Sequence, residues 1–180
     1  MRRIKQKLGE ELEIEWRSFL LRPEPNPDRD LETFKKYTES WERPASYEPE
    51  AMFRPWATDE GPPSHSVPPH LIAKAAARIG PEAFEDIHER LLKAYFTENR
   101  DITSEKVLGD IWGEAGLDPE GMKEAEDPEL VKEVFLQHNE AVEHGASGVP
   151  AVRVEGHFGI IIGAEPEENY LRLVRAAQAK

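Results

Sequence analysis

The chain has 180 residues and no cysteine. Without a thiol it can form no disulfide, offer no thiolate to a metal ion and use no thiol nucleophile. It also lacks any stretch of about 18 consecutive apolar residues, the length that a membrane-spanning helix needs. The residues that follow Met1-Arg2-Arg3 are polar, which does not support a secretory signal. We therefore expect a cytoplasmic protein that does not bind a membrane.

Basic residues are few compared with acidic ones. The sequence holds 23 Lys and Arg against 36 Asp and Glu, and its formal net charge is −13. A surface of this sign repels a phosphate backbone, so we expect no nucleic acid partner.

The first third of the chain changes character twice. A segment of helical composition, Arg2 to Glu11, is followed by Leu12 to Phe19, where apolar and polar residues alternate as in a half-buried strand. Pro23, Pro25 and Pro27 then exclude both a helix and an interior strand. This order predicts a helix, a strand and a crossing into a second domain.

Helices are predicted for most of the middle of the chain. Apolar residues recur at intervals of three and four residues from Asp30 to Trp41, after Leu71, after Pro81, from Ser104 to Ala115 and after Asp127. The proline-rich stretch from Arg43 to Pro69 is predicted to be an ordered loop that covers apolar surface. The middle of the chain therefore predicts an all-α domain.

The period changes after Gly145. Ala151–Glu155 and Phe158–Ile162 are predicted to form a β-hairpin, and a last helix is predicted from Pro166. A strand, a set of helices, a hairpin and a terminal helix indicate an α/β fold that an all-α insertion interrupts.

Two short motifs flank the predicted hairpin. Gly148-Val149-Pro150 precedes it, and Gly163-Ala164-Glu165-Pro166 follows it. Together they resemble the C-terminal motif of the DsbA-like thioredoxin family, in its FrnE-like thiol-disulfide oxidoreductase branch. The resemblance extends through Tyr95–Ile102 and back to Trp16–Pro23, so it covers nearly the whole chain.

The resemblance implies a thioredoxin-like fold with an inserted all-α helical domain and with the first strand missing. It divides the chain into an incomplete thioredoxin-like domain, residues 1–24 and 145–180, and an inserted helical domain, residues 25–144. It also implies a cis bond before Pro150. In the family this loop faces the redox-active residues, and an extended peptide pairs with it, so Val149 and Pro150 are the predicted substrate contacts. The implied partners are a cysteine-containing protein or peptide, or a small thiol or disulfide.

The catalytic part of the family pattern is absent. The family's first strand ends in Cys-x-x-Cys at a helix N-terminus, which lowers the pKa of the first thiol. Because Arg2–Gly9 resembles the end of the helix that follows this motif, the sequence suggests an N-terminal truncation. We therefore predict a redox-inactive chain with no catalytic residue and no cofactor. The missing strand is central in the family's sheet, so we also expect an irregular sheet.

Several alternatives stay open. Glutathione-dependent isomerases and kappa-type transferases, such as 2-hydroxychromene-2-carboxylate isomerase, share the architecture and a Phe-Leu-Leu stretch like Phe19-Leu20-Leu21. They typically carry Gly-x-Asp-Arg where this chain has Gly163-Ala164-Glu165-Pro166, which favours the oxidoreductase branch. A non-catalytic peptide-binding thioredoxin-like module is the third hypothesis, and a homodimer is compatible with the sequence.

A metal site is not predicted. Glu85 and His88 have the spacing of two ligands on one helical face, but no second pair completes a site. His138 falls on an apolar stripe and is predicted to be a packing residue.

Overall fold

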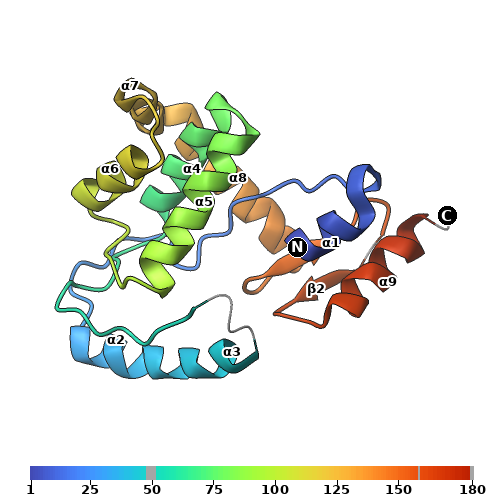
Figure 1. Cartoon of the computed structure of the whole chain (residues 1–180), viewed down its shortest axis with the longest axis horizontal. Helices are drawn as coiled ribbons and strands as arrows, with labels where there is room; N and C mark the ends of the chain where they lie inside the picture. Colours follow the sequence, from blue (N-terminus) through green and yellow to red (C-terminus); the bar gives the residue numbers. More distant parts are fainter. Residues whose placement is uncertain (48–51, 158, 179–180) are drawn as a thin grey trace. The chain divides into compact units, whose positions relative to one another are not determined.

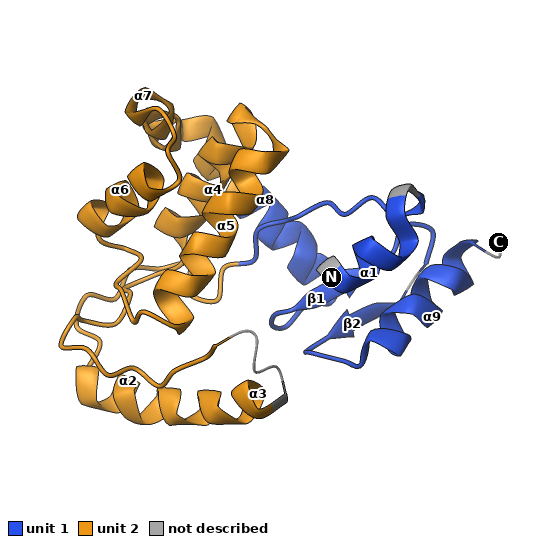
Figure 2. Ribbon diagram, viewed as in Figure 1, with its two compact units in different colours: residues 1–19, 135–180 blue, residues 20–134 orange. Residues whose placement is uncertain are grey.

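The computed structural model describes residues 1–47, 52–157 and 159–178. The described chain separates into two compact units (Figure 2). Unit 1 comprises residues 1–19 and 135–180, and unit 2 comprises residues 20–134. The boundaries differ from the predicted ones mainly in that residues 135–144, the second half of a long helix and the residue after it, belong to unit 1. The predicted division into functional domains stays a prediction.

Unit 2 consists of helices joined by extended segments (Figure 1). Its helices are α2 (Leu31–Thr38), η2 (Glu39–Trp41), α3 (Glu42–Tyr47), α4 (Val67–Ile79), α5 (Pro81–Phe96), α6 (Glu105–Glu114), α7 (Pro119–Met122) and η4 (Lys123–Glu126). Helix α8 (Pro128–Glu143) begins in unit 2 and ends in unit 1. The largest core cluster packs apolar side chains of α4, α5, α6 and the start of α8, with Ile87, Ile111 and Trp112 almost fully buried.

A second cluster in unit 2 is aromatic. Trp41 and Trp56 are buried around Phe34, and Tyr95 and Phe96 of α5 pack against them. Burial raises the pKa of the Tyr95 hydroxyl to about 12, although the nearby guanidinium of Arg29 partly opposes the rise. These rings therefore form a core and not an exposed groove for peptides.

Sequence patterns located most helices correctly. The helices predicted from Asp30, Pro81, Ser104 and Asp127 are present as α2, α5, α6 and α8. The predicted loop from Arg43 to Pro69 is partly wrong, because residues 42–47 form α3 and α4 already begins at Val67. Prolines 44, 68 and 69 lie in the first turns of these helices, where the missing N–H has no helical partner to lose. The remainder of this prediction includes residues 48–51, which lie outside the described residues.

Unit 1 contains α1 (Arg2–Leu8), η1 (Gly9–Glu11), the end of α8, β1 (Ala151–Arg153), β2 (Ile160–Ile162) and α9 (Glu167–Gln178). β1 and β2 pair antiparallel, with Val152 opposite Ile161. The Nζ of Lys7 and Oε1 of Glu167 lie 2.5 Å apart, so an ion pair links α1 to α9. The predicted hairpin is confirmed with shorter strands, although Phe158 lies outside the described residues.

The predicted strand from Leu12 to Phe19 is wrong. The segment is extended in part and its half-buried residues, Leu12 and Ile14, alternate with exposed ones, but it forms no strand. In the described part of the chain the sheet has only β1 and β2. An alternating pattern becomes a strand only when a neighbouring strand takes up its backbone hydrogen bonds, and no strand among the residues that the structure describes pairs with this segment.

No helix within the described ranges has the length and apolar character that crossing a membrane requires.

Candidate functional site

The predicted site follows the C-terminus of α8. The helix ends in a pair of backbone hydrogen bonds: the amide of Gly145 donates to the carbonyl of Val142, and the amide of Ala146 donates to that of Ala141, both at 2.9 Å. This is the Schellman pattern, which requires a left-handed residue. Gly145 supplies it with φ of 90°. The cap turns the chain out of the helix and into the loop that precedes β1.

Val149 and Pro150 lie at the end of this loop. The bond between them is cis. The side chain of Val149 is 50% exposed, and Pro150 is also exposed. The carbonyl of Pro150 accepts a hydrogen bond from the amide of Gly163 at 2.8 Å, which fixes the loop to the end of β2. The two predicted contact residues are therefore presented together on the surface of unit 1.

The register of the hairpin determines the direction of the backbone groups next to this loop. Residues directly opposite in an antiparallel pair alternate between hydrogen-bonded and non-hydrogen-bonded pairs. Because Pro150 and Gly163 are hydrogen-bonded, Val152 bonds to Ile161, and the backbone groups of Ala151 and Arg153 point away from β2. Among the described residues no strand lies on that edge of β1. An extended chain could therefore pair with Ala151 and Arg153 and continue past Val149.

The extended segment of residues 12–19 is held to α8 by side chains. The amide of Ser18 donates to Oε1 of Gln137 at 2.8 Å, and Nη2 of Arg17 lies 2.5 Å from Oε2 of Glu140. The rings of Phe19 and His138 meet edge to face with centroids 5.0 Å apart. The structure thus agrees with the predicted packing role of His138.

Two histidines lie near the strands, His144 before β1 and His157 in the loop between β1 and β2. Nε2 of His144 lies 2.9 Å from Nη1 of Arg153, and Nδ1 of His157 accepts a hydrogen bond from the amide of Gly159 at 2.9 Å. Each histidine therefore has a local partner.

No group of three or more His, Asp or Glu side chains is placed to hold a metal ion in the part of the chain that the structure describes. The ring of His88 stacks on Phe84, with centroids 5.4 Å apart.

Sequence patterns did not identify three features of the site. The Gln137 side chain that binds the Ser18 amide lies on a helix whose pattern shows only its apolar face. The contact between His144 and Arg153 joins residues whose proximity depends on the path of the loop. The outward backbone groups of β1 depend on a register that only the pairing of Pro150 with Gly163 determines.

Comparisons with known proteins agree with this fold. A putative protein disulfide isomerase from Nitrosomonas europaea is similar, with a TM-score of 0.71, 17% identity, and coverage of 86% of this chain and 78% of the other. The cytosolic disulfide reductase DsbM from Pseudomonas aeruginosa is similar, with a TM-score of 0.70, 16% identity, and coverage of 99% of this chain and 86% of that one. The structure of DsbM with GSH gives a TM-score of 0.71 at the same identity and coverage. No curated protein sequence matches the chain.

The sequence model of the DSBA-like thioredoxin domain matches residues 1–175, nearly the whole chain. The thioredoxin-like fold with a helical insertion is thus confirmed, and its sheet is reduced to two strands in the described residues. The chain belongs to the DSBA-like thioredoxin domain family.

Proposed function

We propose that this chain is a peptide-binding member of the DSBA-like family that descends from thiol-disulfide oxidoreductases and is itself redox-inactive. Thiol-disulfide exchange starts with the attack of a thiolate on a disulfide sulfur. These 180 residues contain no cysteine, so they offer no attacking thiolate. The function left to them is recognition of an extended, cysteine-containing peptide or protein at Val149 and Pro150.

One observation carries the proposal: an outward-facing backbone edge lies directly after an exposed valine and proline. The backbone groups of Ala151 and Arg153 point away from β2, and the Val149 side chain next to them is 50% exposed. A peptide that adds a strand to such an edge gains affinity from main-chain hydrogen bonds and selectivity from alternate side chains. Val149 would contact one of those side chains.

A small thiol is the second candidate ligand. One of the similar DsbM structures is a structure with GSH, a tripeptide thiol. Glutathione has a short backbone that could pair with the same edge, which keeps the glutathione-dependent branch as an alternative. This chain lacks that branch's Gly-x-Asp-Arg pattern, because Gly163 is followed by Ala164, Glu165 and Pro166.

The proposal includes the cytoplasm as the compartment, because the DsbM neighbour is named as cytosolic. It includes neither a membrane nor nucleic acid as a partner, because a net charge of −13 repels both anionic surfaces.

Fluorescence anisotropy with a short labelled peptide that contains one cysteine tests the proposal. Val149→Glu should weaken binding by about tenfold or more, because it places a desolvated charge in the contact. Val142→Glu is the matched control, because Val142 lies in the same unit and is equally exposed at 50%. Equal affinity of the two variants would contradict the proposal. Competition with oxidised glutathione that depends on Val149 would favour the second candidate.

A redox assay tests the other half of the proposal. The chain should not accelerate insulin reduction by dithiothreitol, because it has no thiol that could form a mixed disulfide. Catalysis above the rate of the reductant alone would contradict it.

A further inference from the structure

The second edge of the hairpin, on β2, is also open. Since Ile161 bonds to Val152, the alternation directs the backbone N–H and C=O groups of Ile160 and Ile162 away from β1. Within the described ranges, no strand pairs with β2 on that side. This edge is separate from the Val149–Pro150 loop, so its capacity to pair does not depend on the proposed function.

The β2 edge lacks the features that usually protect an edge strand. Natural proteins protect such edges with lysine, proline, bulges or a covering helix or loop. β2 is Ile160-Ile161-Ile162 without a charge, a proline or a bulge, and Ile162 is 40% exposed. An apolar edge of this kind favours pairing with another strand.

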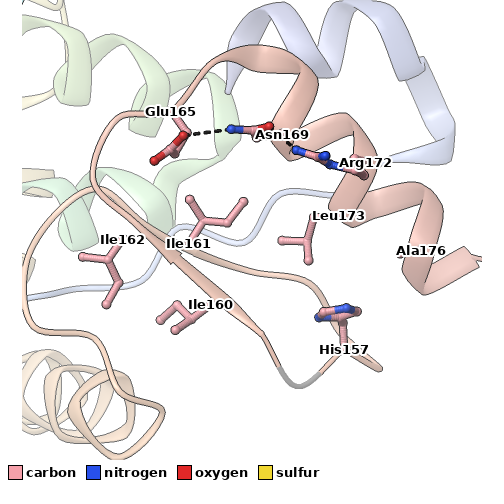
Figure 3. Close-up of a pocket in the computed structure, with 9 residues that line it drawn as sticks. All are labelled: His157, Ile160, Ile161, Ile162, Glu165, Asn169, Arg172, Leu173 and Ala176. Atoms are coloured by element: carbon pink, nitrogen blue, oxygen red, sulfur yellow. Dashed lines mark hydrogen bonds between the residues drawn. The ribbon is translucent and has the colours of Figure 1, made fainter.

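A groove of about 510 Å³ accompanies this strand (Figure 3). All three isoleucines line it on one side, and Leu173 and Ala176 of α9 line it on the other. A strand laid along β2 would bury this apolar surface, and burial of apolar surface favours association.

Charged and polar groups stand at opposite ends of β2. Glu165 follows the strand, and His157 precedes it (Figure 3). Glu165 is held in place by Asn169, whose Nδ2 donates to Glu165 Oε2 at 2.8 Å, and Arg172 donates to Oδ1 of Asn169. An antiparallel strand that brought an acid to the His157 end and a base to the Glu165 end would match both.

A second copy of this chain has that arrangement. We propose that β2 pairs antiparallel with β2 of another copy about a twofold axis through Ile161. Ile160 then lies opposite the partner's Ile162, and the outward N–H and C=O groups of each such pair exchange two hydrogen bonds. The same register places Glu165 of each copy at the His157 end of the other. A twofold axis uses the same patch on both copies, so a patch that carries its own donor, His157, and its own acceptor, Glu165, favours a dimer over an unrelated partner.

Sedimentation velocity over roughly 1–200 μM, which brackets the micromolar dissociation constants of a small interface, tests for the dimer. The wild-type chain should form a species of twice the chain mass, and its population should rise with concentration. Ile162→Lys should raise the dissociation constant by about tenfold or more, because it places a charge on the apolar edge. Val142→Lys, at another exposed apolar site of unit 1, should leave the dissociation constant unchanged. A wild-type chain that stays monomeric throughout, or equal effects of the two variants, would overturn the proposal.

A charge-swap experiment tests the register. His157→Glu alone should weaken self-association because it brings two carboxylates together across the axis, and Glu165→Lys alone should weaken it because it removes the carboxylate that faces His157 of the other copy. A mixture of the two variants should recover it, because the mixed dimer pairs His157 with Glu165 at one end and Glu with Lys at the other. If the two substitutions only disturb the structure of their own chain, mixing the variants will not restore self-association. That result would overturn the proposed contact between His157 and Glu165.

Because the chain has no cysteine, a single cysteine introduced at the proposed axis reports its distance from its counterpart in the other copy through disulfide formation. This measurement can still be made if the substitution lowers stability in part. In this register the two Ile161 residues face each other on the axis as a non-hydrogen-bonded pair, with Cα atoms about 4.5 Å apart, close enough for a disulfide. Oxidised glutathione should therefore link I161C chains rapidly, with release of two reduced glutathione molecules per disulfide. V142C chains should link only at the rate of random collision. Equal linking rates would overturn the twofold axis at Ile161.

Discussion

The backbone amide of Ser18 donates a hydrogen bond to Oε1 of Gln137 across 119 residues of sequence, at 2.8 Å. Both residues are buried, Ser18 at 3% and Gln137 at 7% exposure. Because no strand of the described sheet pairs with residues 12–19, this bond satisfies an amide that a ladder would otherwise have taken. The Gln137 side chain thus accepts a backbone hydrogen bond from the extended segment, as a neighbouring strand does in a sheet.

Gln137→Leu should therefore lower the free energy of unfolding by about 1–3 kcal/mol, because it leaves the buried Ser18 amide without an acceptor. Urea denaturation followed by circular dichroism measures the loss. Leu136→Gln is the control, because the neighbouring Leu136 is 58% exposed and surface changes usually stay within about 0.5 kcal/mol. Similar losses in both variants would contradict a specific role for the amide bond.

A second buried bond closes the aromatic cluster. The Oγ1 of Thr38 accepts a hydrogen bond from the Trp56 amide at 2.8 Å and donates to the carbonyl of Lys35 at 2.7 Å. Thr38 is fully buried. Thr38→Val keeps the shape but removes the acceptor, so we expect a loss of about 1–3 kcal/mol in unfolding free energy.

Thr38→Ser is the matched control, because it keeps the hydroxyl and removes one methyl group, at a cost of about 0.8 kcal/mol. Chemical denaturation followed by tryptophan fluorescence measures both variants. If serine costs as much as valine, packing around Thr38 decides its contribution and the hydrogen bond does not.

The helices could be predicted because their signals are local. The predicted starts at Asp30 and Asp127 coincide with residues whose side chains cap a helix N-terminus. Asp30 accepts a hydrogen bond from the amide of Thr33, and Asp127 accepts one from that of Glu129. Such a cap needs only residues within three positions of each other. Gly116, which follows the end of α6, has φ of 68°, a left-handed conformation that glycine adopts without strain.

The strand prediction failed because a strand depends on a partner. Leu12 to Phe19 has the alternation of a half-buried strand, and Leu12 and Ile14 are half-buried as that pattern requires. The order of apolar and polar side chains decides which residues are buried. Strand formation also needs the backbone of a neighbouring strand as a hydrogen-bonding partner. The sequence alone contains the first kind of information only.

The site was predicted through its motif more than through its chemistry. Val149 and Pro150 could be singled out because Gly148-Val149-Pro150 resembles the family's turn, and the structure places both on the surface of unit 1. The directions of the Ala151 and Arg153 backbone groups could not be predicted, because they depend on one hydrogen bond between Gly163 and Pro150. A shift of one residue in that register would reverse them.

The glycine at the C-terminal cap of α8 gives a prediction whose control, a second glycine substitution, should change stability in the opposite direction. Gly145 has φ of 90° in the Schellman turn that leads to the site loop. Gly145→Ala should cost roughly 1–2 kcal/mol, because an L-residue is strained in this region. Gly113→Ala, in α6 where a new Cβ meets no atom within 4 Å, should instead raise stability, by roughly 0.5–1 kcal/mol.

Thermal unfolding of both glycine variants measures these changes. Stabilisation by Gly145→Ala would mean that the left-handed turn is not required. A loss of peptide binding in that variant at a temperature where it is fully folded would link the cap to the position of Val149.

The start of α8 provides a pH-dependent contribution to stability. The carboxylate of Asp127 accepts a hydrogen bond from the Glu129 amide at 2.9 Å and lies 2.8 Å from Nη2 of Arg78. These two contacts, the amide first, lower the pKa of Asp127 below its ordinary value. A carboxyl group with a lowered folded-state pKa stabilises the fold above its unfolded pKa, about 3.9. That contribution is lost as the pH falls through the folded pKa.

Asp127→Asn should therefore lower the melting temperature at pH 7 and reduce the difference in melting temperature between neutral and acidic pH. The asparagine side chain can still accept the Glu129 amide bond, so the change reports mainly the charge and its ion pair with Arg78. Calorimetric scans from pH 7 down to about pH 2.5, below the ordinary Asp value, measure both quantities. Glu126→Gln removes a charge of the same sign from the preceding residue and controls for net charge. If both variants flatten the pH dependence equally, the overall charge of −13 governs acid stability and the Asp127 contacts do not.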